Sequence, residues 1–151
     1  YWPQLFLGIT FNYGLILGWT AIHNEIELIP ILFYLGAIFW TLGYDTIYGY
    51  QDIKDDEIIG LKSTSIKFKK SAKQFLFLCY TILSVLFLVG GYYMNFEYIY
   101  FAIFIVPLIH LFFFQIKKFN KNNPSDCLKI FKSNNMFGLI IFLNILIAKN
   151  L

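Results

Sequence analysis

The sequence predicts an all-α integral membrane protein, a transmembrane bundle of about five helices. Hydrophobic residues make up 58% of its 151 residues and charged residues only 14%, whereas about a quarter of the residues in an ordinary soluble domain are charged. Apolar runs of about 18–22 residues recur between short polar segments, and helices of this length cross a hydrocarbon core about 30 Å thick. Because backbone groups in a lipid bilayer must hydrogen-bond internally, we expect these runs to be helices rather than strands of a barrel.

The first predicted span covers residues 5–22. It follows Pro3, which is tolerated at a helix start because its missing N–H would be unpaired there anyway. Gly14 and Gly18 are small residues four apart, a spacing that lets a neighbouring helix approach closely, and Asn12 is expected to hydrogen-bond across such a contact. A place in a ligand pocket is the alternative for Asn12.

The second predicted span begins near Leu28 and runs into the most acidic stretch of the chain, YDTIYGYQDIKDDEIIGLKST at residues 44–64. At 1.5 Å per residue, Asp45 lies about 24 Å along this helix from Ile29, within the hydrocarbon, and Asp52 about 35 Å along, at the interface. If the helix continues, a rotation of about 100° per residue places four side chains on one face. They are Asp45, Tyr48, Asp52 and Asp56.

Two further spans are predicted over residues 72–92 and 98–116. Pro107 is expected to kink the second of them. His110 follows in an apolar stretch, where a packed, hydrogen-bonded histidine is the expected role and a catalytic base is the alternative.

The fifth predicted span covers residues 134–148, and Asn134 and Asn135 are placed to cap its N-terminus. The residues before it, up to Lys132, are expected to form a basic loop. Cys79 and Cys127 differ too much in position and surroundings to predict a disulfide or a metal site, so both are expected to be structural.

The positive charge of the chain predicts the orientation of the bundle. Six lysines lie in residues 50–73 and five in residues 117–132, so two segments hold eleven of the twelve basic residues and the alternate loops hold none. By the positive-inside rule, these two segments and the acidic stretch face the cytoplasm. The lysines are not interleaved with stacking aromatic residues on a polar face, so the net charge of +3 does not predict a nucleic-acid partner.

The acidic stretch has the residue types of a divalent-cation site. Carboxylates one helical turn apart destabilise a helix by about 0.2–0.5 kcal/mol per pair, and a carboxylate deep in a bilayer costs about 2.5–3.5 kcal/mol. Mg²⁺ offsets such charges, because one or two carboxylates hold it while a substrate's phosphates complete its shell. Lys62, Ser63 and Thr64 then offer a cation and two hydroxyls to the same anion. The alternative is a helix end whose acids simply face water.

The order of residues in this stretch is more specific than its composition. YDT, then Y, D and DD, then GLKST occur in succession, which resembles the second aspartate-rich motif of the UbiA superfamily of membrane prenyltransferases, and most of all its 4-hydroxybenzoate polyprenyltransferase group. The resemblance covers residues 1–151, including CLKIFKSNNMFGLIIFL at residues 127–143. It implies that the chain is the C-terminal half of one UbiA-type domain, with the second motif at residues 45–64. The N-terminal half with the first aspartate-rich motif is the expected partner, and the C-terminal half alone is expected to be inactive.

The resemblance implies Mg²⁺-dependent transfer of a polyprenyl group from polyprenyl diphosphate to 4-hydroxybenzoate, ortho to its hydroxyl, in ubiquinone biosynthesis. Asp52 and Asp56 are expected to hold Mg²⁺, and Asp45 to hold a second ion or orient water around the first. The residues expected to contact the diphosphate are Lys62, Tyr48, Ser63 and Thr64. Asn134 and Asn135 fall near the mouth of the site by this comparison, so a pocket role stands beside capping.

The resemblance also implies a setting for the reaction. Aromatic faces are expected to steady an allylic cation, and the polyprenyl tail is expected to lie in an apolar groove between helices. The implied location is a bacterial or mitochondrial inner membrane, with the site toward the cytoplasm or matrix.

Three other interpretations stay open. A prenyltransferase for another acceptor, homogentisate or a naphthoate, shares the acidic motif, and only the GLKST extension favours the 4-hydroxybenzoate group. An ion-coupled transporter also carries intramembrane acids, but here the acids gather at one interface with a lysine rather than at the midplane. A purely structural bundle would need partners for three carboxylates, and the chain has no arginine to supply them.

Overall fold

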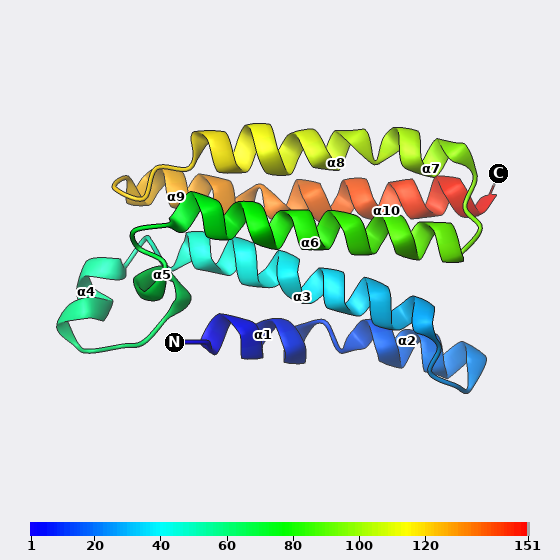
Figure 1. The fold of residues 1–151 in the computed structure, drawn as a ribbon, viewed down its shortest axis with the longest axis horizontal. Coiled ribbons are helices and arrows are strands. Elements are labelled where there is room, and N and C mark those ends of the chain that lie inside the picture. The colour runs from blue at the N-terminus through cyan, green and yellow to red at the C-terminus, as the bar shows by residue number, and fades with distance from the viewer. Residues whose placement is uncertain (151) are drawn as a thin grey trace.

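The structure, a computed structural model, describes residues 1–150 and consists there of helices and short turns, with no strand (Figure 1). In chain order the helices are α1 (Pro3–Phe11), α2 (Gly14–His23), α3 (Leu28–Tyr48), α4 (Ile53–Ile58), α5 (Thr64–Lys67), α6 (Ala72–Tyr93), α7 (Tyr98–Ile103), α8 (Ile105–Ile109), the π-helix η1 (His110–Ile116), α9 (Pro124–Lys132) and α10 (Asn134–Asn150). Five stretches among these residues are long and apolar enough to cross a membrane, so the predicted five-span bundle is confirmed. The spans are Pro3–His23, Leu28–Tyr48, Ala72–Tyr93, Tyr98–Ile116 and Pro124–Lys149.

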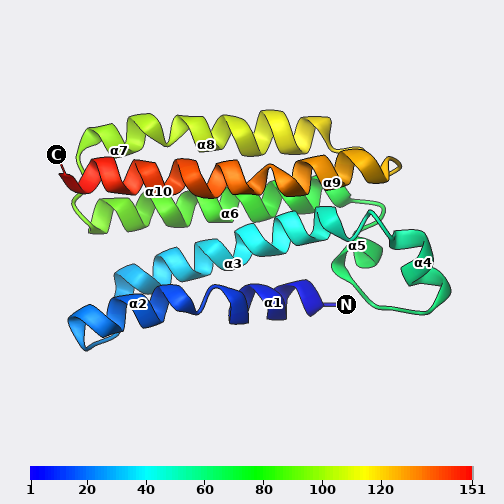
Figure 2. The ribbon, with the colours of Figure 1, turned by 180° about the vertical axis from the view of Figure 1, so that it is seen from behind.

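The spans lie side by side with their long axes roughly parallel (Figures 1 and 2). Helix α3 is central, because it packs against α1, α2, α6 and α9. Helix α10 packs against α7 and α8, and η1 packs against α6. The short helices α4 and α5 lie beyond one end of the bundle, where the N-terminus also lies, whereas the C-terminus lies at the opposite end (Figure 1). Both lysine-rich segments and the acidic stretch therefore gather at one end.

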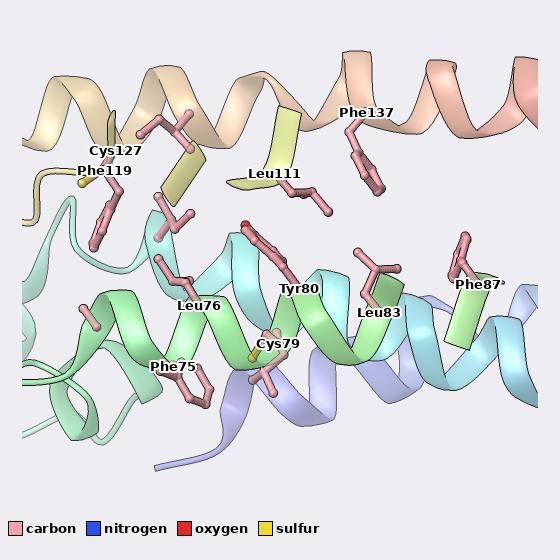
Figure 3. Packing of buried hydrophobic residues seen from close by; sticks show 14 of the residues in the cluster. Phe75, Leu76, Cys79, Tyr80, Leu83, Phe87, Leu111, Phe119, Cys127 and Phe137 are labelled. Carbon is pink, nitrogen blue, oxygen red and sulfur yellow. The ribbon is translucent and has the colours of Figure 1, made fainter. Parts of the chain in front are cut away.

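The core is built on one face of α6. Leu76, Tyr80 and Leu83 are fully buried there and point toward the space that Leu111 of η1 fills from the other side (Figure 3). On α3, Gly43 leaves room for Tyr80, since a Cβ at Gly43 would lie 2.5 Å from Cε1 of that ring. Helices in a bilayer associate through such close contacts, because lipid tails are as apolar as the side chains themselves.

The first span is interrupted between α1 and α2 instead of running as one helix. The side-chain amide of Asn12 donates to the Gly8 carbonyl and to Thr41 Oγ1 on α3, both at 2.8 Å. A side chain bonded to the backbone in this way competes with helical hydrogen bonds. The predicted hydrogen bond of Asn12 across a helix contact is thereby confirmed. A Cβ at Gly14 or Gly18 would meet nothing within 4 Å, so this pair makes no close helix contact among the described residues.

The second span ends at Tyr48, so the prediction of one helix continuing through Asp56 is wrong. Residues 49–52 form a turn, and the short helix α4 follows as a separate element. The reason is tertiary: the Ser65 side chain packs across the end of α3 in the space that a Cβ of Gly49 would fill. Gly60 forms the turn after α4 with a φ of 76°, a left-handed conformation that glycine adopts without strain.

The fourth span consists of α7, α8 and η1. Pro107 has no N–H to donate to the Ile103 carbonyl, and α7 ends at Ile103, so an interruption caused by this proline agrees with the predicted kink. His110, the first residue of η1, has its Nε2 3.2 Å from Ser133 Oγ. The expected packed and hydrogen-bonded histidine is therefore observed.

The fifth span begins at Pro124 rather than at Asn134, so the prediction of a loop over residues 124–132 is wrong. Proline is favoured in the first turn of a helix, and α9 starts with it. Helix α9 buries Cys127 and Ile130 and leaves Lys129 exposed. Its lysines are compatible with a helix because they lie on the exposed face and near the C-terminal end of the helix dipole.

Candidate functional site

All acidic residues of the motif except Asp45 lie on α4 or just before it, beyond the end of the bundle (Figure 1). Asp52 is the residue before α4, and the N–H groups of Asp55 and Asp56 both donate to its carbonyl at 3.0 Å. Asp52 and Asp56 are thus one helical turn apart, a spacing that places Cβ atoms about 5–6 Å from each other. Although the long helix is broken, α4 restores the predicted pairing of these two carboxylates.

The carboxylates of the motif have almost no cationic partners. Within the described residues the only ion pair joins Glu57 to Lys69, with Nζ 2.7 Å from Oε1. Asp45, Asp52 and Asp56 have none there. No group of three or more His, Cys, Asp or Glu in this part of the chain is arranged as metal ligands. Mg²⁺ does not need such a group, because it is commonly held by one or two carboxylates while substrate oxygens and water complete its shell.

A hollow of about 440 Å³ lies beside α4, and we call it the acidic hollow. Asp52 and Asp55 line it together with Tyr50 and Gln51, and three lysines also contribute to its lining: Lys54, Lys69 and Lys121. Tyr50 Oη and Gln51 Oε1 are buried and have no hydrogen-bond partner. Burying such an atom unpaired costs about 1–3 kcal/mol. Carboxylates beside unpartnered oxygens make the acidic hollow suited to a ligand or ion that binds oxygen.

Tyr50 and Gln51 were not among the residues predicted from the sequence. The signal available for them was their position inside the motif, between Tyr48 and Asp52. The packing of Tyr50 on Phe119 and the burial of Gln51 Oε1 could not be read from that position alone.

The structure does not bring all predicted site residues into one pocket. Asp45, Asp56 and Lys62 do not line the acidic hollow. Asp45 is half-buried in the last turn of α3, one turn after Thr41 and so on the face that Asn12 approaches. Lys62 is exposed, with its Nζ 5.9 Å from the centre of the Tyr1 ring.

The segment Ser63–Ser65, which we call the clamp, is buried against α3 and α1. Thr64 Oγ1 lies 2.6 Å from Thr46 Oγ1, and Ser65 Oγ donates to the Thr46 carbonyl at 2.8 Å. The Thr64 N–H donates to Gln4 Oε1 at 3.0 Å, and Ser63 caps α5. The hydroxyls of Ser63 and Thr64 are thus engaged within the protein. The clamp begins directly after Lys62. It therefore anchors the chain next to Lys62 at the last turn of α3, which carries Asp45.

A line of five rings, which we call the aromatic row, leads from the acidic stretch into the bundle. Tyr48 packs on Phe131 with ring centres 4.6 Å apart, and Phe131 lies 5.7 Å from Tyr44. Tyr44 is 5.3 Å from Trp40, which is 4.9 Å from Phe137. Only the tyrosine nearest the acids, Tyr48, was predicted as a site residue. The four-residue spacing of positions 40, 44 and 48 was the sequence signal for the rest of the row on α3.

The aromatic row ends at a groove of about 390 Å³, which we call the apolar groove. Trp40 and Phe137 belong to both. Residues of α2, α3, α6 and α10 also line it, and they are almost all aromatic or aliphatic. The apolar groove is the described surface that suits a long hydrocarbon tail.

Trp40 is held in place by a buried polar network. Its Nε1 donates to Asn134 Oδ1 at 2.8 Å, and Gln115 Nε2 donates to the same oxygen at 3.0 Å. Tyr80 OH in turn donates to Gln115 Oε1. Asn134 therefore points into the bundle, and the prediction that it caps a helix is wrong because its carbonyl oxygen is already engaged. Asn135 is exposed.

Comparisons with known proteins show the family of the chain. The model of the UbiA prenyltransferase family matches residues 1–145. The chain is 43% identical to a mitochondrial 4-hydroxybenzoate polyprenyltransferase of Bos taurus, over 98% of this chain and 40% of that protein. The proteins of the same name from Homo sapiens and Drosophila melanogaster are 42% and 41% identical, over 98% of this chain and 40% and 38% of theirs. The chain thus spans about two fifths of the length of the curated relatives it matches. No solved structure matches it.

Proposed function

Because the chain belongs to the UbiA prenyltransferase family, we propose that it is the C-terminal part of an enzyme that transfers a polyprenyl group from polyprenyl diphosphate to 4-hydroxybenzoate. The relatives carry this acceptor in their names. The proposed product carries the new group ortho to the hydroxyl and serves ubiquinone biosynthesis. We also propose that the first aspartate-rich motif lies in a part of the full-length protein outside this chain, and that the C-terminal part alone is inactive.

The observation that carries the proposal is the continuity of three surfaces. Carboxylates without cationic partners lie on and before α4, the aromatic row runs from Tyr48 along α3, and the apolar groove receives its other end. A polyprenyl diphosphate has the same order of chemistry, from anionic head through reactive allylic carbon to hydrocarbon tail. The substrate and this side of the bundle therefore share the same order of chemistry.

Asp52 and Asp56 are the residues proposed to hold Mg²⁺, and Asp45 is proposed to hold a second ion or its water. They fit the ion because they are carboxylates without ion-pair partners, and Asp52 lines the acidic hollow with two residues whose buried oxygens lack partners. When bound, Mg²⁺ supplies positive charge that stabilises the departing diphosphate.

The other predicted residues are assigned to binding and positioning. Lys62, exposed next to the clamp, is proposed to contact the diphosphate as a point charge, and Tyr48 to donate to one of its oxygens. Ser63 and Thr64 are proposed to act through Lys62, because their hydroxyls already hold the clamp against α3 and α5. Asn134 is proposed to position Trp40, whereas Asn135 is retained only as a residue near the mouth.

In the proposed reaction the allylic carbon–oxygen bond breaks and its electron pair leaves with the diphosphate. A ring carbon of 4-hydroxybenzoate then forms the new carbon–carbon bond and loses its proton. Rings of the aromatic row present negative faces that stabilise a neighbouring cation, and the apolar side chains around them exclude water from it. Location in a mitochondrial or bacterial inner membrane, with the site on the matrix or cytoplasmic side, is part of the proposal and is supported by the lysine-rich end of the bundle.

The test is transfer of a radiolabelled prenyl group to 4-hydroxybenzoate in membranes that contain the full-length protein. We expect product formation to require Mg²⁺, to stop with EDTA, and to fall by about two orders of magnitude or more in Asp52→Asn and Asp56→Asn, since each loses a charged ligand. Glu25→Gln, at the opposite end of the bundle, is the matched control. Full activity in Asp52→Asn would mean that the acidic stretch is structural, and activity only with homogentisate or a naphthoate would replace the proposed acceptor.

A further inference from the structure

A second hollow lies at the same end of the bundle, where α6 begins and η1 ends. Its volume is about 580 Å³, and we call it the lysine hollow. No acidic residue lines it. Five cationic side chains do: Lys70, Lys73, Lys117, Lys118 and Lys121. Like charges around one hollow repel each other, so this arrangement favours the binding of an anion.

The lysines are not neutralised by other parts of the protein. Among the described residues, Lys70, Lys73 and Lys117 have no interaction partner. Lys118 Nζ lies 4.5 Å from the centre of the Phe114 ring, and Lys121 Nζ donates to a backbone carbonyl at 2.9 Å. Neither contact supplies a negative charge. The side chains of Lys70, Lys73 and Lys117 are thus available to a ligand, whereas Lys121 also lines the acidic hollow.

The backbone adds donors to the same hollow. Residues 71–74, at the start of the 22-residue helix α6, form part of its lining. No side chain caps this helix start, and its first turn has no acidic residue. The first N–H groups of a helix have no partner within the helix and carry partial positive charge, which favours phosphate oxygens.

The position of the lysine hollow identifies the source of the phosphate. Two spans, Ala72–Tyr93 and Tyr98–Ile116, meet the water at its rim, so it lies at the depth of the lipid headgroups. Phe119, which also lines it, is almost fully buried and gives it an apolar wall. We propose that the lysine hollow binds the phosphate headgroup of an anionic membrane lipid. The lysine hollow adjoins the acidic hollow, because Lys121 and Asn122 line both, but no carboxylate lines it to hold a metal ion, so binding is independent of Mg²⁺.

The test is native mass spectrometry of the purified chain with dioleoylphosphatidic acid, in EDTA, with dioleoylphosphatidylcholine as the uncharged comparison. We expect phosphatidic acid to be retained and Lys73→Gln/Lys117→Gln to weaken its binding by roughly 10- to 30-fold, the effect of two lysines near an anionic headgroup. Lys129→Gln/Lys132→Gln removes the same charge from α9 at the same end of the bundle and is expected to keep the parent's binding. Circular dichroism and thermal midpoints check that both variants fold.

Three results would overturn the proposal. Equal losses in the two double variants would mean that net charge, not the lysine hollow, attracts the lipid. Equal retention of phosphatidylcholine, whose phosphate charge is balanced by choline, would show that the net negative charge of the headgroup is not recognised. A requirement for Mg²⁺ would show that the carboxylates bind the ligand through the metal. A separate arm with excess inorganic phosphate distinguishes the two sources, because full displacement of the lipid by phosphate would show that free phosphate is the ligand.

Discussion

Tyr50 shows how a single residue links the fold to the proposed chemistry. Its side chain is buried at the wall of the acidic hollow, and its hydroxyl has no partner. Burial raises the pKa of this phenol, because the ionised form is disfavoured away from water. The phenol therefore stays protonated through neutral pH and remains a hydrogen-bond donor next to Asp52.

Replacing Tyr50 by phenylalanine separates structural from functional roles. We expect Tyr50→Phe to leave the chain equally stable or up to about 1–3 kcal/mol more stable, because an unpaired buried hydroxyl is removed. Prenyl transfer by the full-length protein is expected to fall, since a hydrogen-bond donor in the wall of the acidic hollow is lost. Thermal unfolding and the transfer assay measure the two effects, with exposed Tyr92→Phe as control. Lower stability combined with full activity would show that the hydroxyl serves only the fold.

Site residues could be predicted from the sequence only where they belong to the contiguous motif. Asp52 and Asp56 keep their predicted spacing, because one turn of α4 is enough to set it. The aromatic row was not predictable, since Phe131 and Phe137 come from a distant segment and meet α3 only in the folded bundle. The hydrogen bonds of Asn134 were not predictable for the same reason, because its partners Trp40 and Gln115 are remote in sequence.

At the scale of elements, the buried network makes η1 depend on α10. Asn134 is the acceptor shared by Trp40 and Gln115. In Asn134→Leu both donors lose their partner inside the bundle, and each unsatisfied donor costs about 1–3 kcal/mol. We therefore expect roughly 2–5 kcal/mol of destabilisation, measured by denaturant unfolding in detergent micelles.

The adjacent residue supplies the control for this prediction. Asn135→Leu has the same change in chemistry one position along, but Asn135 is exposed, so little destabilisation is expected. Trp40 emission should shift in the Asn134 variant only. Equal stabilities of the two variants would show that the network adds nothing to the packing of α3, η1 and α10.

Helix ends were predictable where local sequence sets them. Helices α3 and α6 begin at the predicted residues, Leu28 and Ala72, because an apolar run starts directly after a polar turn. The end of α3 was not predictable, since it depends on Ser65 packing at Gly49. Helix α9 was not predicted, because its lysines indicate a basic loop. The amphipathic spacing of Cys127 and Ile130 was the only local signal for a helix.

At the scale of the whole molecule, the odd number of spans places the two termini at opposite ends of the bundle. Five spans place the N-terminus at the end covered by α4 and α5 and the C-terminus at the other end (Figure 1). Lys67 confirms this, because its Nζ lies 4.1 Å from the centre of the Trp2 ring. Anionic lipid and the membrane potential favour the lysine-rich end on the cytoplasmic or matrix side.

The orientation can be measured by labelling single cysteines in sealed vesicles. Cys79 and Cys127 are buried, so the parent chain is expected to give little background with a membrane-impermeant maleimide. Two cysteine variants, Asn122→Cys and Ser125→Cys, place the label at the lysine-rich end. Two others, Glu25→Cys and Glu97→Cys, place it in the turns at the opposite end. All four positions are exposed. We expect the first pair to react only when the cytoplasmic or matrix face is outward and the second pair only in the reverse orientation. Labelling of all four positions from one side would contradict five crossings, whereas a complete exchange of the two pairs would keep the fold and reverse the side of the membrane on which the acidic hollow opens.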